Sequence, residues 1–140
     1  LLDKYEAKVI CSENCKENLP DASNTYFRLY YDRENYTYSV RKVDSTTESL
    51  GNKLDWSNHE IKFIPTPGHS MGSICIYIEG NLFSGDTIMQ YKAYVNKRNG
   101  NFELYKHSIQ NIINIFSEET IVYPEHGVIF LLKDKNNIKY

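Results

Sequence analysis

Two apolar segments joined by a tight turn constrain the fold of this chain more than any other feature. The run "SICIYIE" (73–79) is followed by "LFSG" (82–85), and Glu79-Gly80-Asn81 between them is typical of a two-residue hairpin turn. The pair predicts an antiparallel hairpin, and the continuous apolar run predicts a strand that is covered on both faces. The preceding segment "EIKFIP" (60–65) alternates and predicts a further strand.

The rest of the chain adds helices to these strands. Leu104, Ile109, Ile112, Ile113 and Phe116 recur at helical spacing and predict a helix over 104–116. Shorter signals predict strands at 8–11 and 120–124, a helical turn after Ser12 as N-cap, and a polar loop with a short hairpin inside it at 44–59; residues 24–43 fit a helix or a strand. This order predicts a mixed α/β fold in one domain over residues 1–140.

The composition excludes several classes of function. The chain has 140 residues, of which 41% are hydrophobic and 24% charged, and a net charge of −2. A mildly acidic chain lacks the basic surface that would attract nucleic acids or anionic membranes. Its apolar runs are also too short to cross a bilayer.

The three cysteines suit neither a disulfide scaffold nor a zinc ribbon, because their number is odd and no CxxC occurs. We expect Cys75 to be a small buried apolar residue, and Cys11 and Cys15, four apart, to share a helix face. A reducing, cytoplasmic setting follows.

Three polar residues stand just beyond predicted strand ends, each beside a Gly or Pro that lets the backbone turn sharply. They are His69 in "TPGHS", Asp86 in "SGD" and His126 in "YPEHG". If these strands are neighbours in the sheet, the three side chains meet at one rim. Two imidazoles and a carboxylate suit zinc, iron or manganese.

These motifs resemble the metallo-β-lactamase superfamily of metal-dependent hydrolases, and its glyoxalase II-like members above all. The resemblance runs over "TPGHSMGS", the hairpin, "LFSGDTI" and "VYPEHG". It implies a four-layer αββα sandwich with a mixed, mostly antiparallel sheet and flanking helices. It also implies that His69 binds one metal, that His126 binds a second, and that Asp86 bridges both as a catalytic residue. In such enzymes the metals, most often zinc, lower the pKa of bound water, and hydroxide attacks an ester, thioester or related bond of a small molecule.

The superfamily's His-x-His-x-Asp-His run, which supplies most metal ligands, is absent from the 140 residues. We therefore expect a single partial domain, the C-terminal portion of a longer hydrolase, that binds metal weakly or not at all and is inactive alone. Without the first half, its sheet would expose apolar side chains, so we expect self-association or pairing with the missing N-terminal half. Tyr91, Lys92 and Tyr94 follow Asp86 and would lie near the substrate.

Two other functions remain open from the sequence. The chain could be a non-catalytic split or degenerate subunit that serves as a binding module. It could also be a nucleic-acid-processing relative of the same fold, which its acidic charge disfavours.

Overall fold

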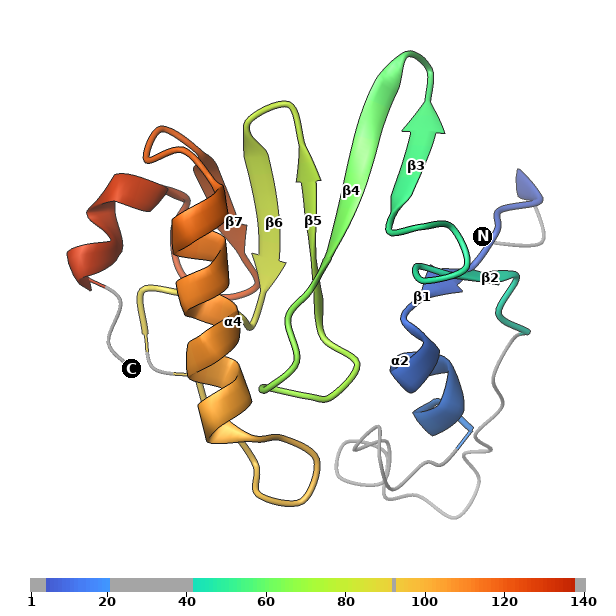
Figure 1. Ribbon diagram of the computed structural model, residues 1–140, viewed down its shortest axis with the longest axis horizontal. Coiled ribbons are helices and arrows are strands. Elements are labelled where there is room, and N and C mark those ends of the chain that lie inside the picture. Colours follow the sequence, from blue (N-terminus) through green and yellow to red (C-terminus); the bar gives the residue numbers. More distant parts are fainter. Residues whose placement is uncertain (1–4, 21–41, 92, 138–140) are drawn as a thin grey trace.

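A six-stranded sheet forms the body of the protein (Figure 1). The computed structural model describes residues 5–20, 42–91 and 93–137. The sheet has the order β3-β4-β5-β6-β7-β8, and every neighbouring pair is antiparallel except β6 and β7, which are parallel. Its strands are β3 (Lys53–Trp56), β4 (His59–Pro65), β5 (Ile74–Ile78), β6 (Asn81–Gly85), β7 (Ile121–Pro124) and β8 (Phe130–Leu131). The helices α2 (Glu13–Asn18) and α4 (Phe102–Ile115), the 3-10 helix η1 (Leu132–Asn137) and a parallel pair, β1 (Ile10–Cys11) with β2 (Ser45–Thr46), complete the described fold. A mixed α/β fold with a mostly antiparallel sheet is thus confirmed.

Two tight turns set the register of two strand pairs, β3 with β4 and β5 with β6. Glu79 and Gly80, with φ of 45° and 83°, connect β5 to β6 and confirm the predicted hairpin. Ser57 and Asn58, with φ of 48° and 69°, connect β3 to β4 in the same way. Positive φ at both central residues is the geometry that matches the twist of paired strands. The prediction of a hairpin contained within 44–59 was wrong, because β3 pairs with β4 and β4 begins at His59.

Helix α4 covers one face of the sheet and contributes Tyr105, Ile109 and Ile112 to the core. It begins after Asn101, whose side chain accepts hydrogen bonds from the amides of Glu103 and Leu104. Ile109 and Ile112 of the helix are fully buried and belong to one apolar cluster with Leu82 and Val122 of the sheet. The predicted helix is therefore confirmed, and it starts two residues earlier than the periodicity indicated because the cap lies at Asn101.

The opposite face of the sheet carries an apolar row across four strands. Phe63, Ile76, Phe83 and Tyr123 are successive register partners, and the rings of Phe83 and Tyr123 stack at 4.9 Å between centroids. The side chains alternate with the core residues Cys75, Leu82 and Val122, so the row points away from α4. Phe83 is 46% exposed and Ile76 and Tyr123 are half-buried, whereas Phe63 at the end of the row is only 7% exposed. The prediction that the 73–79 strand is covered on both faces was wrong for the described part of the chain.

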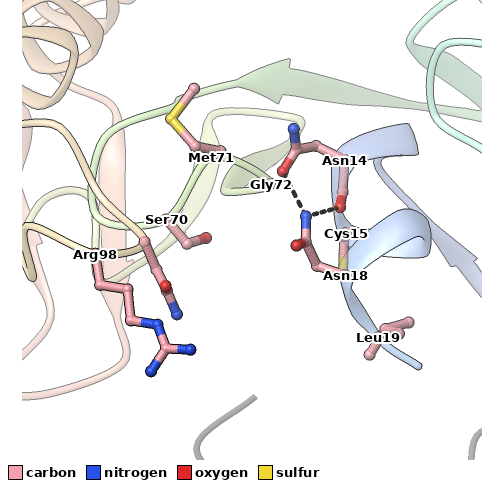
Figure 2. Close-up of a pocket in the computed structure, with 9 residues that line it drawn as sticks. Asn14, Cys15, Asn18, Leu19, Ser70, Met71, Gly72 and Arg98 are labelled. Atoms are coloured by element: carbon pink, nitrogen blue, oxygen red, sulfur yellow. Dashed lines mark hydrogen bonds between the residues drawn. The ribbon is translucent and has the colours of Figure 1, made fainter. Parts of the chain in front are cut away.

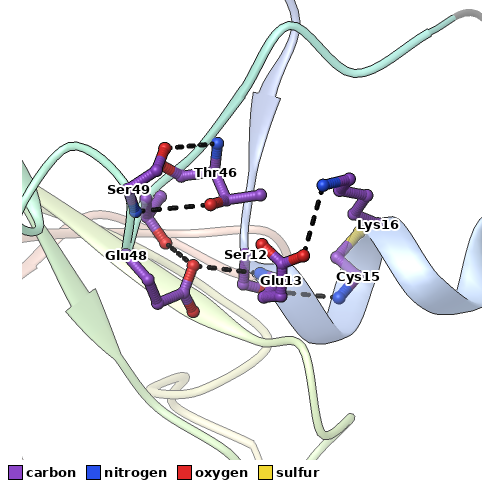
Figure 3. A network of polar contacts seen from close by, with 8 residues as sticks. Ser12, Glu13, Cys15, Lys16, Thr46, Glu48 and Ser49 are labelled. Carbon is purple, nitrogen blue, oxygen red and sulfur yellow. Dashed lines mark hydrogen bonds and ion pairs between the residues drawn. The ribbon is translucent and has the colours of Figure 1, made fainter.

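Helix α2 is tied to the sheet through its first turn (Figure 3). The buried Ser12 hydroxyl accepts a hydrogen bond from the Cys15 amide at 3.2 Å and donates one to the Gly72 carbonyl at 2.8 Å. Glu48 accepts a hydrogen bond from the Glu13 amide at 3.0 Å. Hydrogen bonds from backbone amides, its own first and that of Glu13 next, lower the pKa of the Glu48 carboxyl. The predicted N-cap at Ser12 is confirmed.

The cysteines near α2 do not share a helix face, contrary to expectation, because Cys11 lies on β1 and only Cys15 lies on the helix. All three thiols are free. Burial, together with the neighbouring Cys15, raises the pKa of the Cys11 thiol to about 11. Among the described residues, no helix is long and apolar enough to cross a membrane.

Replacing Ser12 by alanine should lower the free energy of unfolding by roughly 1–3 kcal/mol, because it removes a helix cap and leaves the Gly72 carbonyl without its donor. Urea denaturation would measure the loss. Ser117→Ala is the matched control: Ser117 also accepts a backbone amide, that of Glu119, but is exposed, so its effect should stay within about 0.5 kcal/mol. Equal effects in the two variants would contradict the role given to Ser12.

Candidate metal centre

The strand directions bring the three predicted site residues to one rim of the sheet. Strands β4, β6 and β7 run the same way, because β4 and β6 are both antiparallel to β5 and β7 is parallel to β6. His69 follows the end of β4, Asp86 follows β6 and His126 follows β7. Parallel strands end at the same edge, and the Glu125 amide donates to the Gly85 carbonyl at 3.1 Å, which aligns the last two ends.

The carboxylate of Asp86 lies between the two imidazoles. His69 Nε2 is 3.4 Å from Asp86 Oδ2, and His126 Nε2 is 3.8 Å from Asp86 Oδ1. Each carboxylate oxygen thus faces a different ring. The side chains of His69 and Asp86 are 34% and 30% exposed, whereas that of His126 is 71% exposed. The centre is therefore a half-buried pair with a third group on its solvent side.

The turn that carries His69 is held in place by the start of α4. Gly68 has a φ of +146°, and a Cβ there would lie 2.3 Å from the Tyr105 backbone, so this position needs glycine. Ser108 donates to the Pro67 carbonyl at 2.8 Å, and the Asn101 amide donates to the Gly68 carbonyl at 2.8 Å. Helix and turn are thereby joined on both sides of the glycine, which fixes the histidine that follows it.

A buried hydroxyl layer connects the two motifs below the rim, and the sequence did not single it out. Thr66 and Thr87 are 3.1 Å apart through their Oγ1 atoms, and Thr66 also lies 3.7 Å from the Cys75 sulfur. Thr66 stands three residues before His69 and Thr87 directly follows Asp86, so this contact ties the roots of the two loops together. Burial raises the pKa of the Cys75 thiol to about 11, so it stays protonated at neutral pH. Its expected role as a small buried residue is confirmed.

The three predicted substrate contacts have different positions. A Cβ on Gly127 would lie 3.6 Å from Tyr91 Cε2, so the Tyr91 ring sits against the turn that follows His126. Tyr94 is 78% exposed and lines a separate groove of about 730 Å³ beside the start of α4. Lys92 lies outside the described residues. The structure therefore brings Tyr91, but not Tyr94, beside the candidate metal centre.

The side chains of His69, Asp86 and His126 are of the types that bind divalent metals, but they are fewer than a metal site needs. His69 Nδ1 is buried without a hydrogen-bond partner in the described part of the chain, which leaves Nε2, the atom that faces Asp86, as the ring nitrogen open to a ligand. Imidazole nitrogens and carboxylate oxygens are the ligand types that zinc, iron and manganese bind in proteins. Across residues 5–20, 42–91 and 93–137, however, no group of three or more His, Cys, Asp or Glu side chains is arranged to hold a metal ion.

Comparison with solved structures identifies the fold. No protein-family model matches the chain. The crystal structure of BLEG-1 B3 metallo-beta-lactamase superposes with a TM-score of 0.82 and 26% sequence identity, over 96% of this chain and 64% of that one. The chain has the metallo-β-lactamase fold. The predicted fold family and the resemblance to this superfamily are therefore confirmed.

Curated relatives agree with the fold. Hydroxyacylglutathione hydrolase of Klebsiella pneumoniae subsp. pneumoniae is 32% identical over 76 residues, which is 54% of this chain and 30% of that protein. The probable polyketide biosynthesis zinc-dependent hydrolase BaeB of Bacillus velezensis is 36% identical over 68 residues, 48% of this chain and 30% of that protein. The matched regions thus span less than a third of either relative, and both relatives are hydrolases by name.

Proposed function

We propose that this chain supplies His69, Asp86 and His126 to the two-metal centre of a metal-dependent hydrolase. The observation that carries the proposal is the position of Asp86, whose two oxygens face two different imidazoles at 3.4 and 3.8 Å. Asp86, His69 and His126 would hold the metal between the carboxylate and the two imidazoles. The zinc-dependent relative supports zinc, and iron or manganese would suit the same donors.

A bound divalent metal would act as a Lewis acid that activates water towards an ester, thioester or related bond of a small molecule. The residues of this chain would hold the metal and keep its ligand side chains in position. The Thr66–Thr87 contact fixes the spacing of the two loops, and the Tyr91 ring lies against the turn after His126. Fixing the positions of the side chains that would hold the metal is what these residues contribute to metal catalysis.

The chain by itself is proposed to be inactive, because one imidazole per ion and a shared carboxylate are fewer than the three protein ligands that a catalytic metal ordinarily takes. The remaining ligands would come from a longer natural form of the protein. We place that protein in the cytoplasm, where its three free thiols would stay reduced, and we propose no nucleic-acid or membrane partner.

A binding module is the second candidate, favoured by the incomplete ligand set among the described residues. In that case the fold would persist without the chemistry, and the three rim residues would have no metal.

The metal content of the longest natural form of the protein tests the proposal. We expect about two ions per chain by elemental analysis, together with hydrolysis of simple esters or thioesters. Asp86→Asn should lose bound metal and lower hydrolysis by more than ~100-fold, since even groups that only support metal ligands cost 10–100-fold when they are removed. Asp55→Asn, an exposed aspartate on β3, is the matched control and should change neither.

Each other outcome has a defined meaning. A metal-free natural protein would favour the binding module. Full metal content and full activity in Asp86→Asn would show that catalysis lies elsewhere. Robust metal-dependent turnover by the 140-residue chain alone would contradict its proposed inactivity.

A further inference from the structure

Three buried side chains below the rim are joined in a row of hydrogen-bonding contacts. Thr66 after β4, Cys75 of β5 and Thr87 after β6 are 1%, 0% and 2% exposed. Thr66 Oγ1 lies 3.1 Å from Thr87 Oγ1 and 3.7 Å from the Cys75 sulfur. The Cys75 thiol in turn donates to the Ser84 carbonyl at 3.6 Å. Because the three side chains are shielded from water, their hydrogens must be taken up inside the protein.

The hydrogens of these groups give the row a direction. Each hydroxyl or thiol has one hydrogen to donate, and the hydrogen of Cys75 goes to the Ser84 carbonyl. The contact between Thr66 and Cys75 is then a hydrogen bond only if Thr66 donates, which leaves Thr87 as the donor to Thr66. This is the one assignment in which all three contacts are hydrogen bonds at once. Burial raises the pKa of the Cys75 thiol to about 11, so the thiol keeps its hydrogen at neutral pH.

Both ends of the row are anchored on the bend that carries Asp86. The Ser84 carbonyl, which accepts from the thiol, also accepts from the Thr87 amide at 2.9 Å. The Ser84 hydroxyl donates to the Ile88 carbonyl at 2.8 Å. Ser84 and Thr87 stand on either side of Asp86 in the sequence, so the hydrogen bonds form a closed circuit through the bend, β5 and the end of β4. The position of the Asp86 backbone is thereby tied to residues of two other strands.

The same circuit closes the base of the loop that carries His69. Thr66 and Cys75 stand near the two ends of this loop, and the Thr66 amide donates to the Ser73 carbonyl at 2.9 Å. The tip of the loop faces α2 (Figure 2). The contact between Thr66 and Cys75 therefore joins the two ends of the loop, and the contact between the two threonines joins its base to the Asp86 bend.

We propose that Thr66 and Cys75 are positioning residues of the candidate metal centre, whose directed hydrogen bonds set the spacing between His69 and Asp86. Neither side chain lies at the rim, so both act through the two loops that they connect. The consequence for metal binding rests on the proposed function, whereas the direction of the hydrogen bonds can be measured without metal.

The S–H stretching band of Cys75 in the infrared spectrum tests the direction. The difference between each protein and the same protein with Cys75→Ala isolates this band from those of other thiols. We expect the frequency of a hydrogen-bonded thiol in the wild type, and also in Thr66→Val, because the Ser84 carbonyl remains as the acceptor. The frequency of a free thiol in either protein would overturn the proposed direction.

The affinity of the longest natural form of the protein for Zn²⁺ tests the positioning role. Thr66→Val should weaken zinc binding at least about tenfold, as expected when a group that orients metal ligands is lost, whereas Thr66→Ser keeps the hydroxyl and should stay within about twofold. Thr120→Val is the matched control, because Thr120 is also 2% exposed but stands before β7, at the edge of the sheet away from the rim. Its affinity should stay within about twofold of the wild type.

Circular dichroism would confirm that the variants fold, and Cys75→Ala, which breaks the circuit at its next member, should weaken zinc binding in the same way. Wild-type affinity in Thr66→Val and Cys75→Ala, or an equal loss in Thr120→Val, would overturn the positioning role. A wild-type protein that binds no zinc, iron or manganese would contradict the proposed function instead, and the infrared band would then decide whether the directed hydrogen bonds exist.

Discussion

Gly68→Ala should lower the free energy of unfolding by roughly 2–6 kcal/mol, one of the two largest effects that we expect from this structure. The added Cβ would lie 2.3 Å from both the amide nitrogen and the Cα of Tyr105, and these are backbone atoms that cannot move aside without shifting α4. The backbone φ of +146° is also one that alanine rarely adopts. Thermal or urea denaturation of the purified variant would measure the loss.

Gly51→Ala separates the two causes. Gly51 also has a positive φ, +65°, but a Cβ there would meet nothing within 4 Å. This control should cost about 1–2 kcal/mol from backbone strain alone. A loss in Gly68→Ala no greater than the loss in Gly51→Ala would show that α4 does not pack as tightly on the His69 turn as the structure has it.

The 140-residue chain by itself should self-associate through the accessible part of the apolar row, formed by Ile76, Phe83 and Tyr123. Burying this row removes apolar surface from water at roughly 25 cal/mol per Å², and a second copy offers the same surface. Sedimentation velocity at micromolar concentrations should show dimers or larger species. This proposal concerns the 140-residue chain by itself.

Two lysine substitutions test whether association uses this face. Phe83→Lys places a charge in the middle of the row and should shift the chain to a monomer. Ile115→Lys places the same charge at an apolar position on the last turn of α4 that is somewhat more exposed, 59% against 46% for Phe83, and should leave association unchanged. A wild-type chain that is monomeric, or equal dissociation by both variants, would contradict the assignment.

The parts of the fold that local pattern controls were predictable. The 104–116 helix and the β5–β6 hairpin followed from periodicity and from Glu79-Gly80-Asn81, because these signals lie within a few residues of the bonds that they form. The meeting of His69, Asp86 and His126 followed from their places after strand ends. Their roles as metal ligands stay predictions. That the chain is the C-terminal portion of a longer domain, as the absence of the His-x-His-x-Asp-His run implies, also stays a prediction.

Features made by distant contacts were not predictable. A hairpin was predicted within 44–59, but its pairing with the next strand was missed because Ser57-Asn58 carries no glycine and does not stand out from the other polar residues of that loop. The Thr66–Thr87 contact joins hydroxyls in two separate loops, and neither looks unusual in sequence. The approach of α2 to the turn after His69, where the Ser12 hydroxyl donates to the Gly72 carbonyl, joins residues that lie far apart in the sequence, and no pattern along the chain indicates it.

The parallel pairing of β6 with β7 also determines when the three rim residues can come together during folding. The strands from β3 to β6 follow one another through short turns, so they pair among near neighbours along the chain. Strand β7 joins them only after the chain has passed through α4, and such long-range closure is slow to form. Asp86 and His126 stand at the two ends of that closure. The three rim residues are therefore brought together by the longest-range pairing of the sheet, and the turn that carries His69 is fixed only once α4 has formed.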